Sequence, residues 1–505
     1  MTTLNINNLS QAQKIGQLIM PRIDFKIPET IERARILVQE FEVGGFIIFN
    51  GKRDIVSEIT RELQSISNIP LLFGCDAERG LGQIVSDKTL YPFTMSLGAT
   101  RDEELVYKQA SFIAEELNYC GLNLIFAPVA DVNSNPDNPI INMRSYSDNP
   151  ELVSILCSAF IKGSQDSGVI ACVKHFPGHG RTGVDSHIDL PVLDQSLENL
   201  KKIDLIPFQK SIENAVAAIM TAHIAFPNIG DGNAVTLSKR LVSDVLRDTL
   251  GYKGLVITDS LHMEGIIKLG EERYLAQKIF EAGCDIILDP QDPLLLIRNL
   301  IDSEKDVYDL NSKVQRILST KKSFPTKQYS GNSAIIKMGQ NLGKQIAEKS
   351  VCLERGGILK SNKAYIYTFD VTNSENIISA PFTRFLEENG IELTNVSVKL
   401  DGIERQITDK ISEDAAVICL VYTTIGAWKK QSILPDTYKE VLSSIESLPN
   451  ETILISFGSP YILRNFEEFK TVLCSFDILD ICQAAAAGVL LGHLEPKGHL
   501  PVDVD

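Results

Sequence analysis

Short apolar runs recur through residues 15–289 and alternate with helix-like segments such as residues 102–119. Near-continuous apolar strands that alternate with helices indicate a parallel sheet covered on both faces. The predicted strands span residues 15–20, 44–49, 70–76, 123–132, 169–176, 217–223, 254–260 and 284–289. The first run fits a helix equally well. Eight strand–helix units predict an α/β fold with an N-terminal (β/α)₈ barrel of the TIM type.

A change of pattern near residues 321–340 predicts a second domain. The chain has 505 residues, which is too long for one ordinary core. The predicted strands that follow span residues 363–370, 395–400, 415–423, 452–458 and 471–476. We therefore predict a barrel over 1–325, a linker or helix over 326–350, and a smaller open-sheet α/β sandwich domain over 351–505.

Polar residues stand where the predicted barrel strands end. They are Asp76, Asp131, Lys174 with His175, His223, Asp259 and Asp289. Strands often end in turn residues, but those are usually Gly, Asn, Ser or Pro, which does not account for His and Lys. Because strand ends converge on one face of a barrel, this pattern predicts an active site there.

Five of the seven histidines lie between His175 and His262, and three fall in the stretch KHFPGHGRTGVDSH (174–187). The stretch ends on Asp185-Ser186-His187. A histidine oriented by a nearby aspartate can act as general acid and base, because its pKa lies near the working pH. Glycines before the triplet give this loop the freedom to move.

Asp259 closes the apolar run GLVITDS (254–260). A carboxylate at the mouth of a barrel can attack the anomeric carbon of a sugar. The alternative is a helix cap or a structural ion pair. Lys174 and His175 offer donors for sugar hydroxyls. Arg144 offers a planar donor fork, although for this residue alone a structural salt bridge is the better interpretation.

A metal site is the alternative interpretation of these histidines. His175, His179, His187 and Asp185 could form a ligand set, but Pro177 and Gly178 exclude the regular helix that the spacing would need. The chain has no HExxH motif and no CxxC pair. We therefore predict no metal.

The composition limits the classes of partner that this protein can bind. The net charge is −16, without basic clusters, which argues against binding nucleic acid or anionic membranes. No apolar stretch reaches the roughly 18 residues that span a bilayer, and the polar start of the chain lacks the core of a signal peptide. Nine cysteines, several in apolar runs, suggest buried free thiols. A cytoplasmic location is predicted, and the oligomeric state stays open.

The stretch 174–187 resembles the signature of glycoside hydrolase family 3 in its β-N-acetylglucosaminidase branch. That branch is marked by K-H-F-P-G-H-G, four variable residues and D-S-H, and every fixed position matches. The segment 251–266 is similar to the family's nucleophile segment. Further similar pieces span residues 127–133, 143–150, 205–212, 220–227 and 492–502, so the resemblance covers nearly the whole chain.

The resemblance implies a retaining, double-displacement mechanism without metal or organic cofactor. Asp259 would form a covalent glycosyl-enzyme, His187 would protonate the leaving oxygen and then activate water, and Asp185 would orient His187. The terminal sugar would be held by Asp76, Arg144, Lys174 and His175, with His223 lining the pocket. The implied activity is exo-β-N-acetylglucosaminidase action on peptidoglycan-turnover or chitin-derived fragments.

Two positions depart from the branch pattern. Arg79 follows Glu78 where the branch often has glycine, and Arg181 stands where many members carry aspartate. Both positions can touch the sugar or its leaving group.

Three alternatives remain. A phosphorylase of the same branch is possible because a histidine acid/base does not repel phosphate, and the sequence does not separate it from a hydrolase. A β-glucosidase or β-xylosidase would usually lack the Asp-Ser-His triplet. An inactive sugar-binding protein would not need Asp259 and His187.

Overall fold

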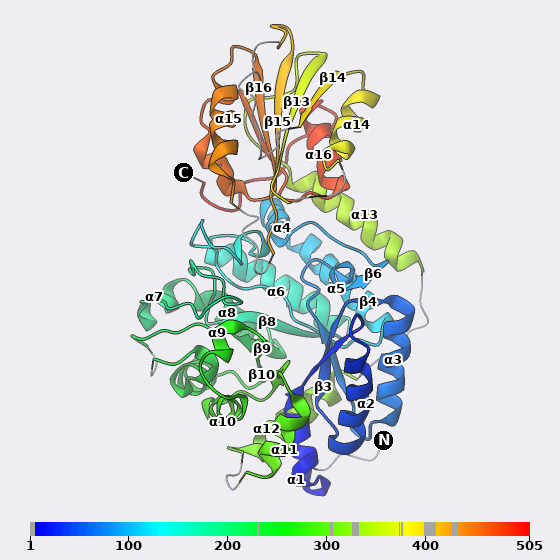
Figure 1. The fold of residues 1–505 in the computed structure, drawn as a ribbon, viewed down its shortest axis with the longest axis vertical. Coiled ribbons are helices and arrows are strands. Elements are labelled where there is room, and N and C mark those ends of the chain that lie inside the picture. Colours follow the sequence, from blue (N-terminus) through cyan, green and yellow to red (C-terminus); the bar gives the residue numbers. More distant parts are fainter. Residues whose placement is uncertain are drawn as a thin grey trace. The chain divides into compact units, whose positions relative to one another are not determined.

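The structure is a computed structural model that describes residues 6–229, 232–303, 307–325, 333–372, 374, 377–397, 411–426 and 433–504 (Figure 1). The chain divides into two compact units. The first is made of Met1–Leu90, Glu103–Val132 and Val153–Gln340, and the second of Tyr91–Asp102, Asn133–Leu152 and Asn341–Asp505. The predicted domain limits remain a prediction, and residues 326–332 of the predicted linker lie outside the described residues.

Parallel strands form the sheet of the first unit. They are β1 (Ile19–Met20), β2 (Arg22–Asp24), β3 (Gly45–Phe49), β5 (Leu72–Cys75), β7 (Leu124–Ile125), β8 (Ile170–Phe176), β9 (Ala218–Thr221), β10 (Leu255–Thr258) and β11 (Ile287–Leu288). Seven pair in the order β10-β9-β8-β7-β5-β3-β2, and β1 pairs with β11. Ile257 of β10 bridges to Ile286 beside β11. Since only Pro21 separates β1 from β2, the pairings run around a ring, and the predicted barrel is confirmed.

Helices cover the outside of this barrel (Figure 1). They include α1 (Gln11–Gln17), α2 (Glu29–Phe41), α3 (Arg53–Ile66), α5 (Glu103–Tyr119), α6 (Pro150–Asp166), α7 (Leu197–Lys202), α8 (Leu205–Glu213), α9 (Glu264–Ile267), α10 (Glu272–Ala282), α11 (Pro293–Ile301), α12 (Leu310–Ser323) and the π-helical η5 (Arg240–Thr249). In α3 the buried residues Val56, Thr60 and Leu63 share one face at i, i+4 and i+7. This spacing places one stripe of the helix against the sheet.

Two predicted strands differ from the observed ones. The run 15–20 is largely helix α1, which starts at a capping box formed by Ser10 and Gln13, and only its last two residues form β1. The run 123–132 gives the short β7 and an isolated bridge at Val129. Pro128 has no N–H group, so the strand ladder is interrupted between them.

The second unit contains a six-stranded sheet in the order β12-β17-β16-β15-β13-β14. The strands are β12 (Cys352–Arg355), β13 (Lys363–Asp370), β14 (Glu392–Ser397), β15 (Ala416–Tyr422), β16 (Glu451–Phe457) and β17 (Thr471–Cys474). All neighbours are parallel except β12 and β17. The short edge strand β12 was not predicted, because only two of its four residues, CLER, are apolar, which is too short a run to indicate a strand. Residues 398–400 of the predicted strand 395–400 lie outside the described residues.

Helices lie on both faces of this second sheet. Tyr438, Leu442 and Ile445 of α15 (Asp436–Glu446) join the core on one face. The other face packs against α14 (Ala380–Glu388), α16 (Asp480–Leu490) and the end of α13 (Ser333–Ser350), as Figure 1 shows for α14 and α16. The short helix α4 (Thr94–Thr100) also belongs to this unit. This layering confirms the predicted open-sheet α/β domain.

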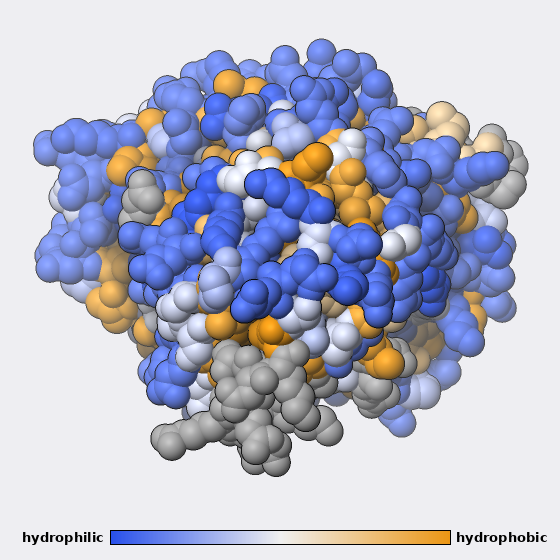
Figure 2. Space-filling model, turned by 90° about the horizontal axis from the view of Figure 1, so that it is seen from above, coloured by the Kyte–Doolittle hydropathy of each residue, from blue (hydrophilic) through white to orange (hydrophobic). Residues whose placement is uncertain are grey.

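Seen from above, hydrophilic residues cover most of the visible face, with hydrophobic residues interspersed (Figure 2). Among the described helices, none is long and apolar enough to cross a membrane.

Candidate active site

Lys174 of β8 is buried between two carboxylates. Its Nζ lies 2.7 Å from Asp76 Oδ1 and 2.7 Å from Glu78 Oε1. Burying an ammonium group is costly unless it is paired, so the two acids hold Lys174 in place. The side chain of Asp76 is 36% exposed and that of Glu78 only 7%. Asp76, directly after β5, is therefore the more accessible acid for a ligand.

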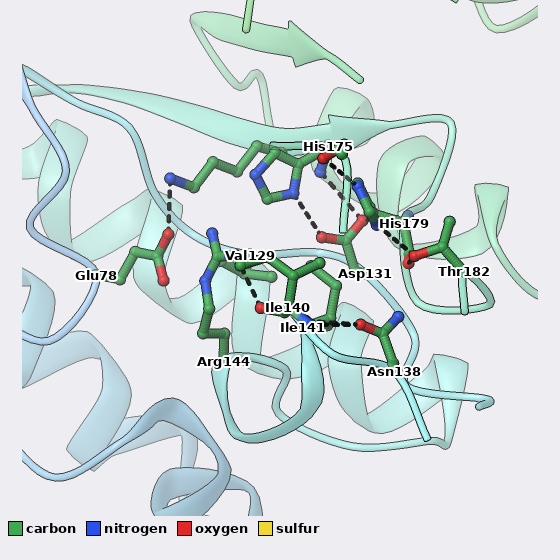
Figure 3. A network of polar contacts seen from close by, with 12 residues as sticks. Glu78, Val129, Asp131, Asn138, Ile140, Ile141, Arg144, His175, His179 and Thr182 are labelled. Atoms are coloured by element: carbon green, nitrogen blue, oxygen red, sulfur yellow. Dashed lines mark hydrogen bonds and ion pairs between the residues drawn. The ribbon is translucent and has the colours of Figure 1, made fainter. Parts of the chain in front are cut away.

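His175 is fixed by Asp131. Asp131 Oδ2 lies 2.7 Å from His175 Nδ1, and its Oδ1 accepts the backbone N–H groups of His175 and His179 (Figure 3). An ionised carboxylate only accepts hydrogen bonds, so Nδ1 carries the proton and the other ring nitrogen, Nε2, is left for a ligand. Burial acts to raise the pKa of Asp131, but its interaction with His175 outweighs burial and holds that pKa below its usual value.

Asp259 directly follows β10 and is half-buried. Its Oδ1 accepts the backbone N–H of Ser260 at 2.8 Å. Burial acts to raise the pKa of this carboxyl, yet the net pKa is lowered. The groups that lower it are His175, His223, His187 and Lys174. Asp259 is thus kept ionised, as a nucleophile must be.

His223 lies two residues after β9 and is fully buried. Its Nε2 donates to the carbonyl of Ser260 at 3.2 Å, and its Nδ1 lies 2.9 Å from Thr236 Oγ1. Burial lowers the pKa of His223, although the charge of Asp259 acts in the opposite direction. His223 therefore packs against the backbone that carries Asp259, through its hydrogen bond to Ser260.

The loop after β8 carries the Asp185–His187 pair. His187 Nδ1 lies 2.7 Å from Asp185 Oδ1, which also accepts the His187 backbone N–H. The Asp185 side chain is 7% exposed and that of His187 is 24% exposed. The carboxylate holds Nδ1 in the protonated form, so Nε2 is the nitrogen that can exchange a proton with a substrate.

The first unit brings most of the predicted site residues together. Contacts and pKa effects connect Asp76, Lys174, His175, Asp185, His187, His223 and Asp259. Arg144 belongs to the second unit, at the end of η3 (Asn142–Arg144), where its Nη1 donates to the Ile140 carbonyl at 3.0 Å (Figure 3). Its role in sugar binding stays a prediction.

Two acidic residues complete this centre beyond the predicted set. Glu78 lies two positions after Asp76. The sequence feature that could have indicated it is its place in the segment that follows a predicted strand. Asp131 is one of the polar residues at the ends of predicted strands, but its pairing with His175 cannot be predicted from the sequence. Both form ion pairs with residues from a different strand, β8.

Arg181 is tied to a buried acid. Its Nε lies 2.9 Å from Oδ2 of Asp204, whose side chain is fully buried at the start of α8. Burial raises the pKa of Asp204 to about 6, although Arg181 acts to lower it. The departure from the family pattern at Arg181 therefore produces an ion pair that anchors the loop.

Asp289, directly after β11, anchors the residue next to Asp259. It accepts a hydrogen bond from Ser260 Oγ at 2.7 Å and pairs with Arg22 of β2. The position of Ser260, and through it that of Asp259, is thus linked to the strands that close the barrel.

Within the described ranges, no group of three or more His, Cys, Asp or Glu residues has the arrangement to hold a metal ion. The reactive groups of the centre are carboxylates, imidazoles and one ammonium group.

The barrel, its ionised carboxylate and the adjacent Asp–His pair define the class of protein, a glycoside hydrolase. The chain matches the family described as glycosyl hydrolase family 3 N terminal domain over residues 11–320. It belongs to glycoside hydrolase family 3.

Individual relatives agree. The chain is 28% identical to beta-hexosaminidase A of Pseudoalteromonas piscicida, with 93% of this chain and 90% of the relative covered. It is 34% identical to a beta-hexosaminidase of Neisseria meningitidis serogroup C over 52% of this chain and 75% of the relative. A solved family 3 beta-N-acetylglucosaminidase from Paenibacillus sp. str. FPU-7 has a TM-score of 0.85 and 29% identity, covering 98% of this chain and 99% of that one.

Proposed function

We propose that this protein is an exo-acting β-N-acetylglucosaminidase that works with retention of anomeric configuration. The observation that carries the proposal is the Asp185–His187 pair, 2.7 Å apart, close enough to Asp259 to lower the pKa of that carboxyl. The names of the relatives support N-acetylglucosamine as the sugar.

The first chemical step forms a glycosyl-enzyme. Asp259 attacks the anomeric carbon, and the bond from that carbon to the leaving oxygen breaks. The electron pair goes to the leaving oxygen, which takes a proton from His187 Nε2. Asp185 stabilises the imidazolium before this transfer and keeps Nε2 in the correct orientation.

The second step regenerates the enzyme. Water attacks the anomeric carbon and gives its proton to His187 Nε2, while the bond to Asp259 breaks and its electron pair returns to the carboxylate. Both steps invert the anomeric centre, so the product keeps the configuration of the substrate.

The sugar is held by side chains at the same end of the barrel. Asp76 accepts hydrogen bonds from hydroxyl groups, Lys174 donates them, and Nε2 of His175, whose ring proton is held on Nδ1, accepts one. His223 lies beside Ser260 at this end, and the donor fork of Arg144, a residue of the second unit, is proposed as a further contact to the sugar. These roles extend the geometry of the first unit to a bound terminal sugar.

The natural substrates in this proposal are fragments from peptidoglycan turnover or chitin, processed in the cytoplasm. A reducing compartment is supported by the nine cysteines, which are all buried and unpaired.

Hydrolysis of p-nitrophenyl β-N-acetylglucosaminide and the matching β-glucoside, each with and without phosphate, tests the proposal. A strong preference for the N-acetyl sugar with free N-acetylglucosamine as product is expected. Preference for the glucoside contradicts the sugar assignment. Sugar 1-phosphate as the main product identifies a phosphorylase, which a histidine acid/base also allows.

A further inference from the structure

His179 is a buried imidazole that the proposed mechanism does not use. Its side chain has hydroxyl groups on both sides: Nδ1 lies 2.8 Å from Thr182 Oγ1, and Nε2 lies 2.9 Å from Ser186 Oγ. Its backbone N–H donates to Asp131 at 2.7 Å (Figure 3). His179 thus connects Asp131, through its backbone, with two points of the loop that carries His187, through its ring.

The protons of this network can be assigned from donor and acceptor capacity. We assign the hydroxyl proton of Thr182 to the His179 carbonyl, which lies 3.0 Å from Thr182 Oγ1 and can only accept. The Thr182 oxygen then accepts from Nδ1–H of a neutral His179. Nε2 carries no proton in this tautomer and accepts the hydroxyl proton of Ser186.

Ser186 is the point at which the loop is held from two sides. Its residue is 2% exposed, whereas Val184 and Ile188 are 44% and 49% exposed. Its carbonyl accepts the backbone N–H of Gly265 at 3.3 Å. A Cβ atom at Gly265 would lie 2.8 Å from that carbonyl oxygen, so this approach requires glycine.

We propose that His179 is a positioning residue for the acid/base of the reaction. By accepting the Ser186 hydroxyl and holding Thr182, it fixes the backbone between Asp185 and His187, and so the direction of His187 Nε2. The inference rests on the proposed function, because it takes His187 as the acid/base. His179 itself touches neither the sugar nor the leaving group in this assignment.

The test compares two substrates with Ser186→Ala. Protonation by His187 matters for a poor leaving group, such as the methanol of methyl β-N-acetylglucosaminide, and little for p-nitrophenolate. We expect kcat/KM for the methyl glycoside to fall about 30-fold or more, approaching the roughly 10²- to 10⁴-fold that general acid–base catalysis supplies, and kcat/KM for the p-nitrophenyl glycoside to fall less than about threefold. Azide attacks the glycosyl-enzyme without a general base. Added azide should therefore restore the kcat of the variant for the p-nitrophenyl substrate.

Ser164→Ala is the matched control. Ser164 is also a buried serine of the first unit, and its hydroxyl donates to the Val169 carbonyl at 3.1 Å, away from the loop. A variant that only loses folded protein shows kcat/KM lowered by the same factor for both substrates, and azide does not restore its activity. Thr182→Val, which keeps the side-chain shape and removes the other hydroxyl, is the second variant if Ser186→Ala does not fold.

The outcomes separate the two proposals. Equal losses on both substrates for Ser186→Ala and Thr182→Val, or none, overturn the role of His179. If His187→Ala also lacks leaving-group dependence and azide rescue, the acid/base assignment itself has failed. If His187→Ala shows both effects and the two hydroxyl variants show neither, only the inference about His179 is wrong.

Discussion

The two units contain sheets built from similar parallel strands, yet their strand ends differ. In the second unit, Asp370 at the end of β13 makes hydrogen bonds within a turn. Its carboxylate accepts the Thr372 backbone N–H at 2.7 Å and the Thr372 hydroxyl at 2.6 Å. Thr423 after β15 accepts the Ser459 backbone N–H at 3.0 Å. Asp370 thus stabilises the turn that follows its own strand, and Thr423 joins the loop after β15 to the loop after β16 through an uncharged hydroxyl group.

The barrel's strand ends instead carry titratable side chains that contact residues at the ends of other strands. Lys174 at the end of β8 pairs with Asp76 after β5, and His223 after β9 donates to Ser260 after β10. A closed ring brings these ends together, whereas an open sheet spreads them along an edge. The apolar runs thus define both folds, and the charged strand ends distinguish the sheet that does chemistry.

The largest expected effect comes from exchanging one carboxylate in each sheet. Asp259→Asn removes the nucleophile and should lower kcat/KM for p-nitrophenyl β-N-acetylglucosaminide by at least about a thousandfold. Asp370→Asn, a matched change at the end of β13, should leave kcat/KM within about twofold, because its loss affects only a local turn. Steady-state kinetics on both variants measures the contrast.

A comparable loss of activity in Asp370→Asn would break the comparison. Circular dichroism and thermal melting of both variants distinguish lost chemistry from lost folding. An active Asp259→Asn would remove the nucleophile assignment.

The second prediction concerns His187→Ala. General acid–base catalysis supplies about 10²- to 10⁴-fold, so turnover should fall within that range. Because p-nitrophenolate leaves without protonation, the variant should release a burst of p-nitrophenol and then turn over slowly as the glycosyl-enzyme hydrolyses. Stopped-flow absorbance measures the burst, and His493→Ala, an exposed histidine of the second unit, should behave like the unmodified protein.

The sequence predicted much of this contrast for physical reasons. Apolar runs of strand length and polar residues at their ends are local signals, so the barrel, the second sheet and the strand-end positions of Lys174 and Asp259 could be inferred. The pairing of Lys174 with Glu78 and of Arg181 with Asp204 could not, since both depend on contacts between segments distant in the chain. The exact ends of the strand near Pro128 and of the helix at residues 11–17 could not be predicted either, because they depend on which backbone groups form hydrogen bonds.

The third prediction tests the contact between strands directly. Lys174→Met leaves Glu78 buried without its cation, which should lower the free energy of unfolding by about 3 kcal/mol. It should also lower kcat/KM by about tenfold to a hundredfold, since a charged donor to the sugar is lost. Chemical denaturation and kinetics measure the two effects.

Combining Lys174→Met with Glu78→Gln separates them. The double variant should regain part of the lost stability, because the uncompensated charge is gone, but not the lost activity. Recovery of activity together with stability would show that Lys174 serves only the fold.

The smallest expected effect is the pH dependence of the Arg181–Asp204 pair. Burial raises the pKa of Asp204 to about 6 in the folded protein, above the value of about 3.9 for an exposed aspartate in the unfolded chain. The acid is therefore protonated in the fold below pH 6, where it does not need a cation, and ionised above pH 6, where it does. Arg181→Met should lower the free energy of unfolding by about 2 kcal/mol at pH 8, and this loss should shrink as the pH falls towards 6 and be absent below it, where Asp204 is protonated with or without Arg181.

Thermal melting between pH 5 and pH 8 checks this prediction. In the variant the pKa of Asp204 should rise further, since the group that lowers it is gone, and adding Asp204→Asn should remove the pH dependence. Arg464→Met is the matched change in the second unit, where Arg464 pairs with Asp137 and the two side chains are 37% and 73% exposed. That loss should stay within about 0.5 kcal/mol and not vary between pH 5 and pH 8, because water screens an exposed pair. An equal pH dependence in both arginine variants would mean that burial does not distinguish the loop of the barrel from the surface of the second unit.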